Sequence, residues 1–270
     1  MYFFLTNLSF LDICNTFITL STLLDSLLTG ETRISFSVCV AQLYFFVSFI
    51  GTEFLLLTAM AYDRYVAICD PLRYVLIMNW RTCALLALAS WVLGFLDVVP
   101  LAVFIFQFSF CEGKEINHFF CELTALMKLS CGDMHSIEIV IFSEGVFMAV
   151  IPSLLTLTSY VYIISRILKI RSAQGRRKTF STCSSHLTIV ILFYGSLFCI
   201  YMRPASMYSP DKDKLFSLLY TALIPMLNPI IYSLRNQEVK KALTHIFVTA
   251  NILRWQNASS SSARRVVCQS

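Results

Sequence analysis

Ionisable side chains stand where long apolar runs of this chain end or are interrupted. The stretch MAYDRYVAIC, residues 60–69, sets Asp63, Arg64 and Tyr65 at the end of a run that is apolar enough for lipid. Four carboxylates lie inside such runs, away from their ends: Asp12, Glu53, Asp97 and Glu144. An unpaired charge at the centre of a bilayer costs roughly 2.5 kcal/mol or more, so Asp12 and Glu53 must face protein or water. Such groups serve a function or only join helices, and the sequence leaves both interpretations open.

Other chemistry finds little support in the residue pattern. Cys183 and His186 of STCSSH lie one helical turn apart, as a nucleophile and its base would, but no third partner accompanies them. A cation channel would need a pore signature or a helix with arginine at every third position, and a transporter would need two similar halves. The sequence has neither feature. We therefore expect no enzyme activity, no cofactor and no metal site.

The elements that carry these groups are membrane-spanning helices. Hydrophobic residues make up 57% of the 270-residue chain, and charged residues only 14%. A helix needs about 20 largely apolar residues to span a bilayer, and six runs approach or exceed this length: 2–24, 36–62, 83–106, 137–165, 186–202 and 215–233. The sequence therefore predicts an all-α, polytopic transmembrane helix bundle with six spans. Pro152 and Pro229 interrupt the hydrogen-bond ladder, so we expect a kink at each.

The distribution of basic residues predicts the orientation of the bundle. Segments 63–81, 166–180 and 234–270 hold most of the 21 Lys and Arg residues. Cytoplasmic loops collect positive charge, so these segments are expected on the cytosolic side. This asymmetry accounts for most of the net charge of +5 without any nucleic acid. With six spans, both termini are then expected in the cytosol.

The chain after the last span divides into two parts. Residues 235–247 have apolar and basic faces at helical spacing, which predicts an amphipathic helix on the inner membrane surface. Residues 248–270 are polar and low in complexity, which is typical of a disordered tail. The predicted domains are a transmembrane domain, residues 1–247, and a cytoplasmic tail, residues 248–270.

Cysteine placement agrees with this orientation. Four of the ten cysteines fall on the predicted outer side, where disulfides persist: Cys39, Cys111, Cys121 and Cys131. Four cysteines allow three connectivities, and spacing alone does not choose among them.

Five stretches occur in an order and spacing that identify a family: MYFFLTNLSFLDIC, MAYDRYVAIC, KTFSTCSSHL, FYG and PMLNPIIYSLRN. With them the chain resembles the olfactory receptors, tetrapod-type or class II, a branch of the rhodopsin-like G-protein-coupled receptors. The likeness extends from residue 1 to about residue 247. It implies a bundle of the seven-helix type that binds small volatile organic odorants and activates a stimulatory heterotrimeric G protein, raising cAMP. The partners are then an odorant, this G protein and membrane lipid, at the plasma membrane.

The resemblance also assigns roles to single residues. It implies that Asp63 holds Arg64 at rest and that Arg64 meets the G protein when the helix starting near Phe180 swings outward, with Tyr65 in the same motif. The hydroxyls of Tyr160 and Tyr232 would stabilise that open state. The resemblance further implies a polar network that contains Asp12 and Asn228, beside the kink expected at Pro229, and a trigger at the pocket floor, Tyr194. It also implies two disulfides, Cys39 with Cys121 and Cys111 with Cys131.

Candidate ligand-binding residues follow from helical register rather than from a motif. They would form an apolar, aromatic cavity, which suits small organic ligands. Glu144 and Met148 would add a polar spot and a soft wall. The alternative is that these side chains are ordinary packing between helices. The candidates from the other two helices are Phe46, Val47, Ile50, Gly51 and Phe54, with Leu197, Phe198 and Tyr201 beyond Tyr194.

The chain also departs from the family pattern. MYFF, which normally opens the second helix of the family, opens this chain. The resemblance therefore covers family helices two to seven, and we expect a six-span chain to be retained in the endoplasmic reticulum and to signal weakly. The alternatives left open are an N-terminally truncated, non-signalling form and a non-olfactory rhodopsin-like receptor. An amine receptor is disfavoured because no acidic residue stands on the third-helix pocket face.

Overall fold

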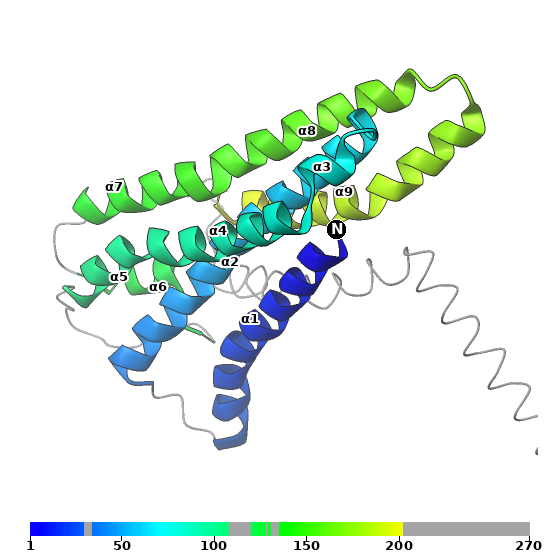
Figure 1. The fold of residues 1–270 in the computed structure, drawn as a ribbon. Coiled ribbons are helices and arrows are strands. Elements are labelled where there is room, and N and C mark those ends of the chain that lie inside the picture. Colours follow the sequence, from blue (N-terminus) through cyan, green and yellow to red (C-terminus); the bar gives the residue numbers. More distant parts are fainter. Residues whose placement is uncertain (30–33, 108–119, 128, 131–134, 202–270) are drawn as a thin grey trace, which may run out of the picture. The chain divides into compact units, whose positions relative to one another are not determined.

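A computed structural model describes residues 1–29, 34–107, 120–127, 129–130 and 135–201. The chain divides into two compact units, Met1–Leu227 and Asn228–Ser270, and every described residue belongs to the first. Its elements are helices (Figure 1): α1 (Tyr2–Thr29), α2 (Phe36–Cys69), α3 (Tyr74–Ile77), α4 (Trp80–Asp97), α5 (Val99–Phe106), α6 (Leu123–Met127), α7 (His135–Glu144), a π-helix (Gly145–Val150), α8 (Ile151–Leu168) and α9 (Ala173–Tyr201).

Four segments are long and apolar enough to cross a membrane: Tyr2–Thr22, Phe36–Cys69, Trp80–Phe106 and His135–Leu168. They contain the first four predicted spans almost in full. The fifth predicted span falls in α9, where His186–Gly195 is a shorter apolar helix among the described residues. The sixth, residues 215–233, lies outside the described residues. The prediction of an all-helical membrane fold is confirmed.

Prolines divide two of these segments. Pro100 stands near the start of α5, where its missing N–H costs least, and the segment changes there from α4 to α5. Before Pro152 the chain forms the π-helix, and the N–H of Ile151 bonds the carbonyl of Val146, five residues back. A local irregularity was expected at Pro152, whereas the break at Pro100 was not predicted.

Polar side chains cap the N-termini of α2 and α4, two central helices of the bundle. Ser35 caps α2 by accepting from the N–H of Val38, and Asn79 caps α4 through a 2.9 Å bond from the N–H of Thr82. Helix α2 packs most extensively against α4 and α8, and also against α1. At 34 residues it is about 50 Å long, so it passes through the whole bundle.

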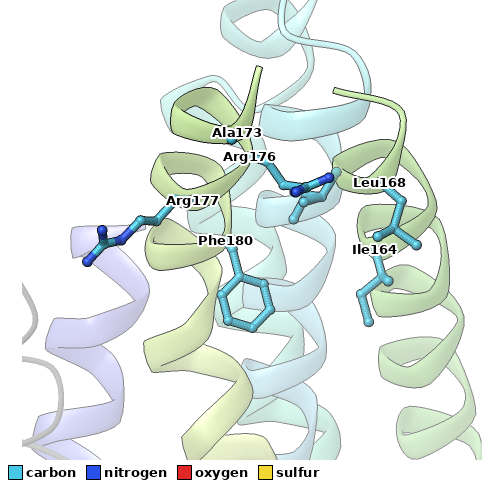
Figure 2. A pocket seen from close by; sticks show the side chains of 7 residues that line it. Ile164, Leu168, Ala173, Arg176, Arg177 and Phe180 are labelled. Carbon is cyan, nitrogen blue, oxygen red and sulfur yellow. The ribbon is translucent and has the colours of Figure 1, made fainter. Parts of the chain in front are cut away.

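Two apolar clusters lie at opposite ends of α2. The outer cluster joins α2 to α5, α6 and α7 and includes Cys39, Leu43 and Leu101. The inner cluster joins α2 to α8 and α9: Ala61, Tyr160, Ile163, Ile167, Cys183 and Val190. Beside the inner cluster, the ends of α8 and α9 leave a groove between them (Figure 2).

Large apolar side chains also cover the outside of the helices. Phe17, Phe142 and Trp80 are among them, each at least 73% exposed. Surfaces of this kind are unfavourable in water and suit contact with lipid chains.

Candidate functional site

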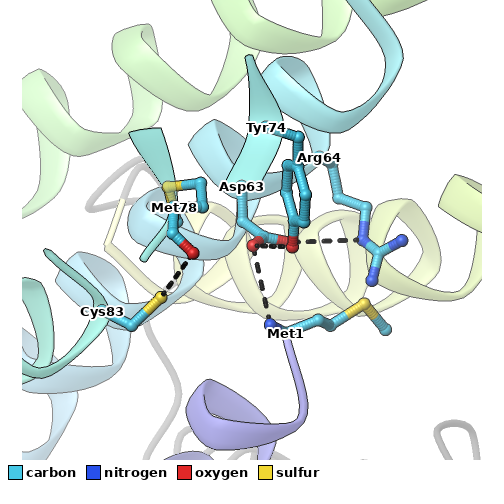
Figure 3. A network of polar contacts seen from close by, with 6 residues as sticks. All are labelled: Met1, Asp63, Arg64, Tyr74, Met78 and Cys83. Carbon is cyan, nitrogen blue, oxygen red and sulfur yellow. Dashed lines mark hydrogen bonds and ion pairs between the residues drawn. The ribbon is translucent and has the colours of Figure 1, made fainter. Parts of the chain in front are cut away.

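Asp63 is the centre of a polar cluster at the inner end of α2 (Figure 3). Its carboxylate is almost fully buried, and Oδ1 accepts a 2.9 Å hydrogen bond from the hydroxyl of Tyr74. The amino group of Met1 lies 3.5 Å from the same oxygen. The other oxygen, Oδ2, lies 3.9 Å from Nε of Arg64, which is an ion pair at its outer limit. The expected pair of Asp63 and Arg64 is therefore present, but Tyr74 is the closer partner.

Tyr74 was missed by the sequence analysis, although it lies only 11 residues after Asp63. It is the first residue of α3, a single turn that the chain forms between α2 and α4. Burial, followed by the neighbouring Asp63 carboxylate, raises the pKa of Tyr74 from 10 to about 12. The phenol therefore stays protonated and can donate throughout the physiological pH range.

Arg64 and Tyr65 face different neighbours. The side chain of Arg64 is only 12% exposed, and Asp63 is the one acid with which it pairs among the described residues. The ring of Tyr65 stacks on Tyr62, with centroids 6.3 Å apart, and meets the edge of Tyr162 of α8 at 5.9 Å. Tyr65 therefore joins α2 to α8.

Tyr160 is bound by a histidine that sequence reasoning did not assign to it. Its hydroxyl lies 2.6 Å from Nδ1 of His186 in α9, and the two rings stack at 5.8 Å. Both side chains are buried, and Nε2 of His186 has no hydrogen-bond partner among the described residues. The thiol of Cys183 bonds the carbonyl of Phe180 at 3.3 Å instead of the imidazole. The Cys183 and His186 pair therefore has no geometry of a catalytic dyad.

A hydrogen-bonded cluster joins α2, α8 and α9 at mid-depth. The hydroxyl of Thr58 lies 3.2 Å from both the carbonyl of Pro152 and the hydroxyl of Thr156, and Thr156 lies 3.4 Å from the hydroxyl of Tyr194. The ring of Tyr194 packs on Phe54 at 5.2 Å. Two candidate pocket residues from different helices, Phe54 and Tyr194, are thus in contact, and the two threonines that link them were not predicted.

The remaining pocket candidates are partly brought together. A methyl group added to Gly51 would lie 3.7 Å from Sδ of Met148, so these two candidates face each other across α2 and the π-helix. Phe46 is buried against Phe120, with ring centroids 5.1 Å apart, and Val47 packs on the outer cluster. Ile50 is half-buried. The side chains of Leu197, Phe198 and Tyr201 lie outside what the structure describes.

Two of the carboxylates inside the spans, Asp12 and Glu53, are shielded from the outside of the bundle. Asp12 and Glu53 are 4% and 3% exposed, as the cost of a charge in lipid requires. Glu144 is half-buried at the end of α7, and its Oε1 has no hydrogen-bond partner among the described residues.

A disulfide between Cys39 and Cys121 fixes the outer end of α2, with Cα atoms 5.3 Å apart. This is the first pairing that the resemblance implied. Gln42, one turn along α2, was missed: its Nε2 donates to the carbonyl of Ile18 and to the hydroxyl of Thr22, both at 2.8 Å. Its Oε1 accepts from the N–H of Cys121 at 3.0 Å. A single amide thus joins α1, α2 and the outer loop.

Several predicted residues lie outside the described residues, and their assigned roles stay predictions. They are Cys111, Cys131, Asn228, Pro229 and Tyr232.

Comparison with known proteins decides the family. The model of the family described as olfactory receptor matches residues 1–250. The chain belongs to the olfactory receptor family. Human olfactory receptor 10A2 is 51% identical to it over 254 residues, which make up 94% of this chain and 84% of that receptor. Human olfactory receptors 1C1 and 8D1 are 44% and 47% identical, covering 95% and 92% of this chain and 82% and 80% of their own lengths.

Family membership places the geometry in context. This olfactory receptor is a multi-pass membrane protein and an odorant-sensing G-protein-coupled receptor, not an enzyme. Asp63 and Phe54, which contacts Tyr194, both belong to α2.

Proposed function

We propose that the receptor binds small volatile organic odorants in the outer half of its bundle and activates a stimulatory heterotrimeric G protein, raising cAMP. The observation that carries this proposal is the pair of sites that α2 connects. One contains Gly51 and Phe54 beside Met148 and Tyr194, and the other contains Asp63 and Arg64. A ligand that alters the first site acts on the second through one continuous helix.

The proposed ligand site combines an apolar wall with one polar group. Phe54 and Tyr194 supply aromatic surface, and Met148 is a flexible side chain that adapts to different shapes. Glu144 supplies a carboxyl oxygen without a partner among the described residues. Small organic molecules with a hydrocarbon body and one hydrogen-bonding group fit this chemistry. Leu197, Phe198 and Tyr201 complete the proposed wall from α9.

The proposed switch rests on contacts that must change together. At rest, Asp63 holds Tyr74 and Arg64, while His186 holds the hydroxyl of Tyr160. Outward movement of the inner end of α9 separates His186 from Tyr160. That hydroxyl, with the hydroxyl of Tyr232, is then available to stabilise an open cleft in which Arg64 meets the G protein. Asp12, Asn228 and Pro229 are proposed to couple the ligand site to this cleft.

The remaining assignments complete the proposal. Residues 1–247 form the receptor domain, with a membrane-surface helix at 235–247, and residues 248–270 form a cytoplasmic tail. Cys111 and Cys131 form the second disulfide. We also propose that the expressed chain is retained in the endoplasmic reticulum, which would lower its density at the cell surface.

A cAMP reporter assay with an odorant panel tests the proposal. The 270-residue chain is expressed unaltered and, in parallel, with the first helix of a family member placed before residue 1. A dose-dependent rise in cAMP with at least one odorant, in either form, supports the proposal. The absence of any response from both forms, at surface densities that give a signal with a known receptor, would contradict it. A response from the extended form alone would favour the non-signalling alternative for the shorter chain.

A further inference from the structure

The groove between the inner ends of α8 and α9 has an apolar lining with two arginines. It encloses about 370 Å³. Ile164, Ile167 and Leu168 of α8 form one side, and α9 forms the other with Ala173, Arg176, Arg177 and Phe180. Phe180 and Leu168 are 49% and 67% exposed, so the apolar lining is open to the outside of the bundle. This surface takes no part in the contacts of the switch described above.

The two arginines differ in direction. In Figure 2 the guanidinium of Arg176 extends toward α8 above the apolar side chains, whereas the guanidinium of Arg177 extends to the opposite side of α9. Both side chains are exposed. Neither forms an ion pair with another residue that the structure describes. The groove therefore has a fixed positive charge at its rim, and Arg176 is the arginine placed over its apolar floor.

No acidic residue balances this charge nearby in the sequence. Between Glu144 and Asp211 the chain contains no Asp or Glu, although it contains Arg166, Lys169 and Arg171 besides the two groove arginines. Arg166, Lys169 and Arg171 lie at or just after the end of α8, where the apolar segment ends at Leu168. In the orientation that the basic residues predict, this is the cytosolic face, where the membrane surface is negative.

We propose that the groove binds an anionic phospholipid of the inner membrane leaflet. The phosphate group pairs with Arg176, because guanidinium groups bind phosphate oxygens in a two-pronged geometry. Arg177, on the opposite side of α9, adds only longer-range attraction. One acyl chain lies along Ile164, Leu168 and Phe180. The lipid spans the gap between α8 and α9 and so contacts α9, the helix that moves in the proposed function. The inference rests on the proposed function and on the predicted orientation of the bundle.

Native mass spectrometry of the purified full chain in detergent measures this binding without odorant or G protein. Its failure is therefore distinguishable from failure of the cAMP assay. The probes are dioleoyl phosphatidylinositol 4-phosphate, dioleoyl phosphatidylcholine with the same acyl chains, and inositol 1,4-bisphosphate, the headgroup alone. We expect saturable binding of the first probe and at least tenfold weaker binding of the other two. Equal binding of the two lipids, or equal binding of the headgroup alone, would overturn the proposal.

Four variants locate the site. Arg176→Gln is expected to weaken binding of the anionic lipid about fivefold, and Arg177→Gln by less. Arg81→Gln removes the same charge from an exposed position on the cytosolic end of α4, outside the groove, and is expected to leave binding unchanged. Ala173→Trp fills the groove without altering charge and is expected to weaken binding at least fivefold.

Each variant tests one part of the proposed lipid site. Full binding by Arg176→Gln would refute the phosphate contact, and full binding by Ala173→Trp would refute the place of the acyl chain. An equal loss in Arg81→Gln would mean that net charge alone attracts the lipid, which also contradicts the proposal. All exchanged side chains are exposed, so elution as a single species and an unchanged melting temperature are expected for each variant.

Discussion

At the residue scale, Asp63 makes a closer contact with Tyr74 than with Arg64. The hydrogen bond from Tyr74 is 2.9 Å long, whereas Nε of Arg64 is 3.9 Å from the carboxylate. Hydrogen bonds to a charged group contribute about 1.5–3 kcal/mol. Tyr74 therefore holds the carboxylate in place, and Arg64 is left with one long ion pair.

Substitution of Tyr74 by Phe is expected to raise basal cAMP several-fold, because it removes one restraint on Asp63 at almost constant volume. Tyr62→Phe makes the same chemical change on an exposed position of α2 and should leave basal cAMP unchanged. The reporter assay without odorant measures both. Equal basal signals in the two variants would show that the Tyr74 contact does not restrain the receptor.

The contact between Tyr74 and Asp63 should not depend on pH near neutrality. The folded pKa of Tyr74 is about 12, above its ordinary value of 10. A raised pKa means that the contribution is complete below pH 10 and is lost only as the pH rises toward 12.

Arg64→Ala is expected to abolish odorant-stimulated cAMP while leaving expression about unchanged, because the role proposed for the arginine is contact with the G protein rather than packing. The parent chain must first give a measurable response. Surface staining on the same cells normalises the signal. A full response at equal surface density would rule out the switch role of Arg64.

At the element scale, one of two facing glycines sets how closely α2 approaches α4. A methyl group at Gly94 of α4 would clash with the hydroxyl oxygen of Thr52 and lie 2.8 Å from its backbone nitrogen. A methyl group at Gly51 of α2 would instead meet its neighbours at 3.7 Å, an ordinary contact. The crossing of α2 and α4 therefore requires glycine at residue 94 but not at residue 51.

Gly94→Ala is expected to destabilise the receptor by about 1–3 kcal/mol, because backbone at the crossing must move apart. Gly51→Ala is the matched control and should change stability much less. Melting temperatures of both variants in the same detergent provide the measurement. A larger loss of stability at Gly51 would show that the close approach of α2 and α4 is not what limits stability.

The disulfide that joins the outer loop to α2 can also be tested. Cys39 and Cys121 are joined across 82 residues, and loss of such a bond costs roughly 2–5 kcal/mol. We expect peptide mapping under non-reducing conditions to recover this pair and a separate link between Cys111 and Cys131. Peptides linking Cys39 to Cys111 or Cys131 would contradict the assignment.

At the scale of the whole molecule, the distribution of charge sets orientation. The turn between α8 and α9, residues 169–172, contains two of the basic residues that predict a cytosolic location. The disulfide of Cys39 lies at the opposite end of α2 from Asp63, which agrees with an outer location for that end.

An epitope inserted after Arg171 is therefore expected to be stained only after cells are permeabilised. An epitope inserted after Gly113, in the predicted outer loop, serves as the control and should be stained on intact cells for those molecules that reach the cell surface. Staining of the first epitope without permeabilisation would reverse the predicted orientation.

The membrane helices, their expected orientation and the positions of Asp63, Arg64 and Tyr194 follow from the amino-acid sequence alone. Apolar length, loop charge and short motifs are local properties, so they can be interpreted before any helix is packed. The contacts of Gln42, Tyr74 and His186 were not found this way, because each is an ordinary polar residue in its own segment.

The partners of these residues depend on the tertiary structure. His186 meets Tyr160 from 26 residues away, and Gln42 meets the N–H of Cys121 from 79 residues away. Such contacts depend on how each helix is rotated and where it crosses the next. Close approaches such as Gly94 against Thr52 set these angles. A one-residue shift along a helix turns a side chain by about 100°, so the hydrophobic pattern of a span does not specify which polar group its neighbour presents.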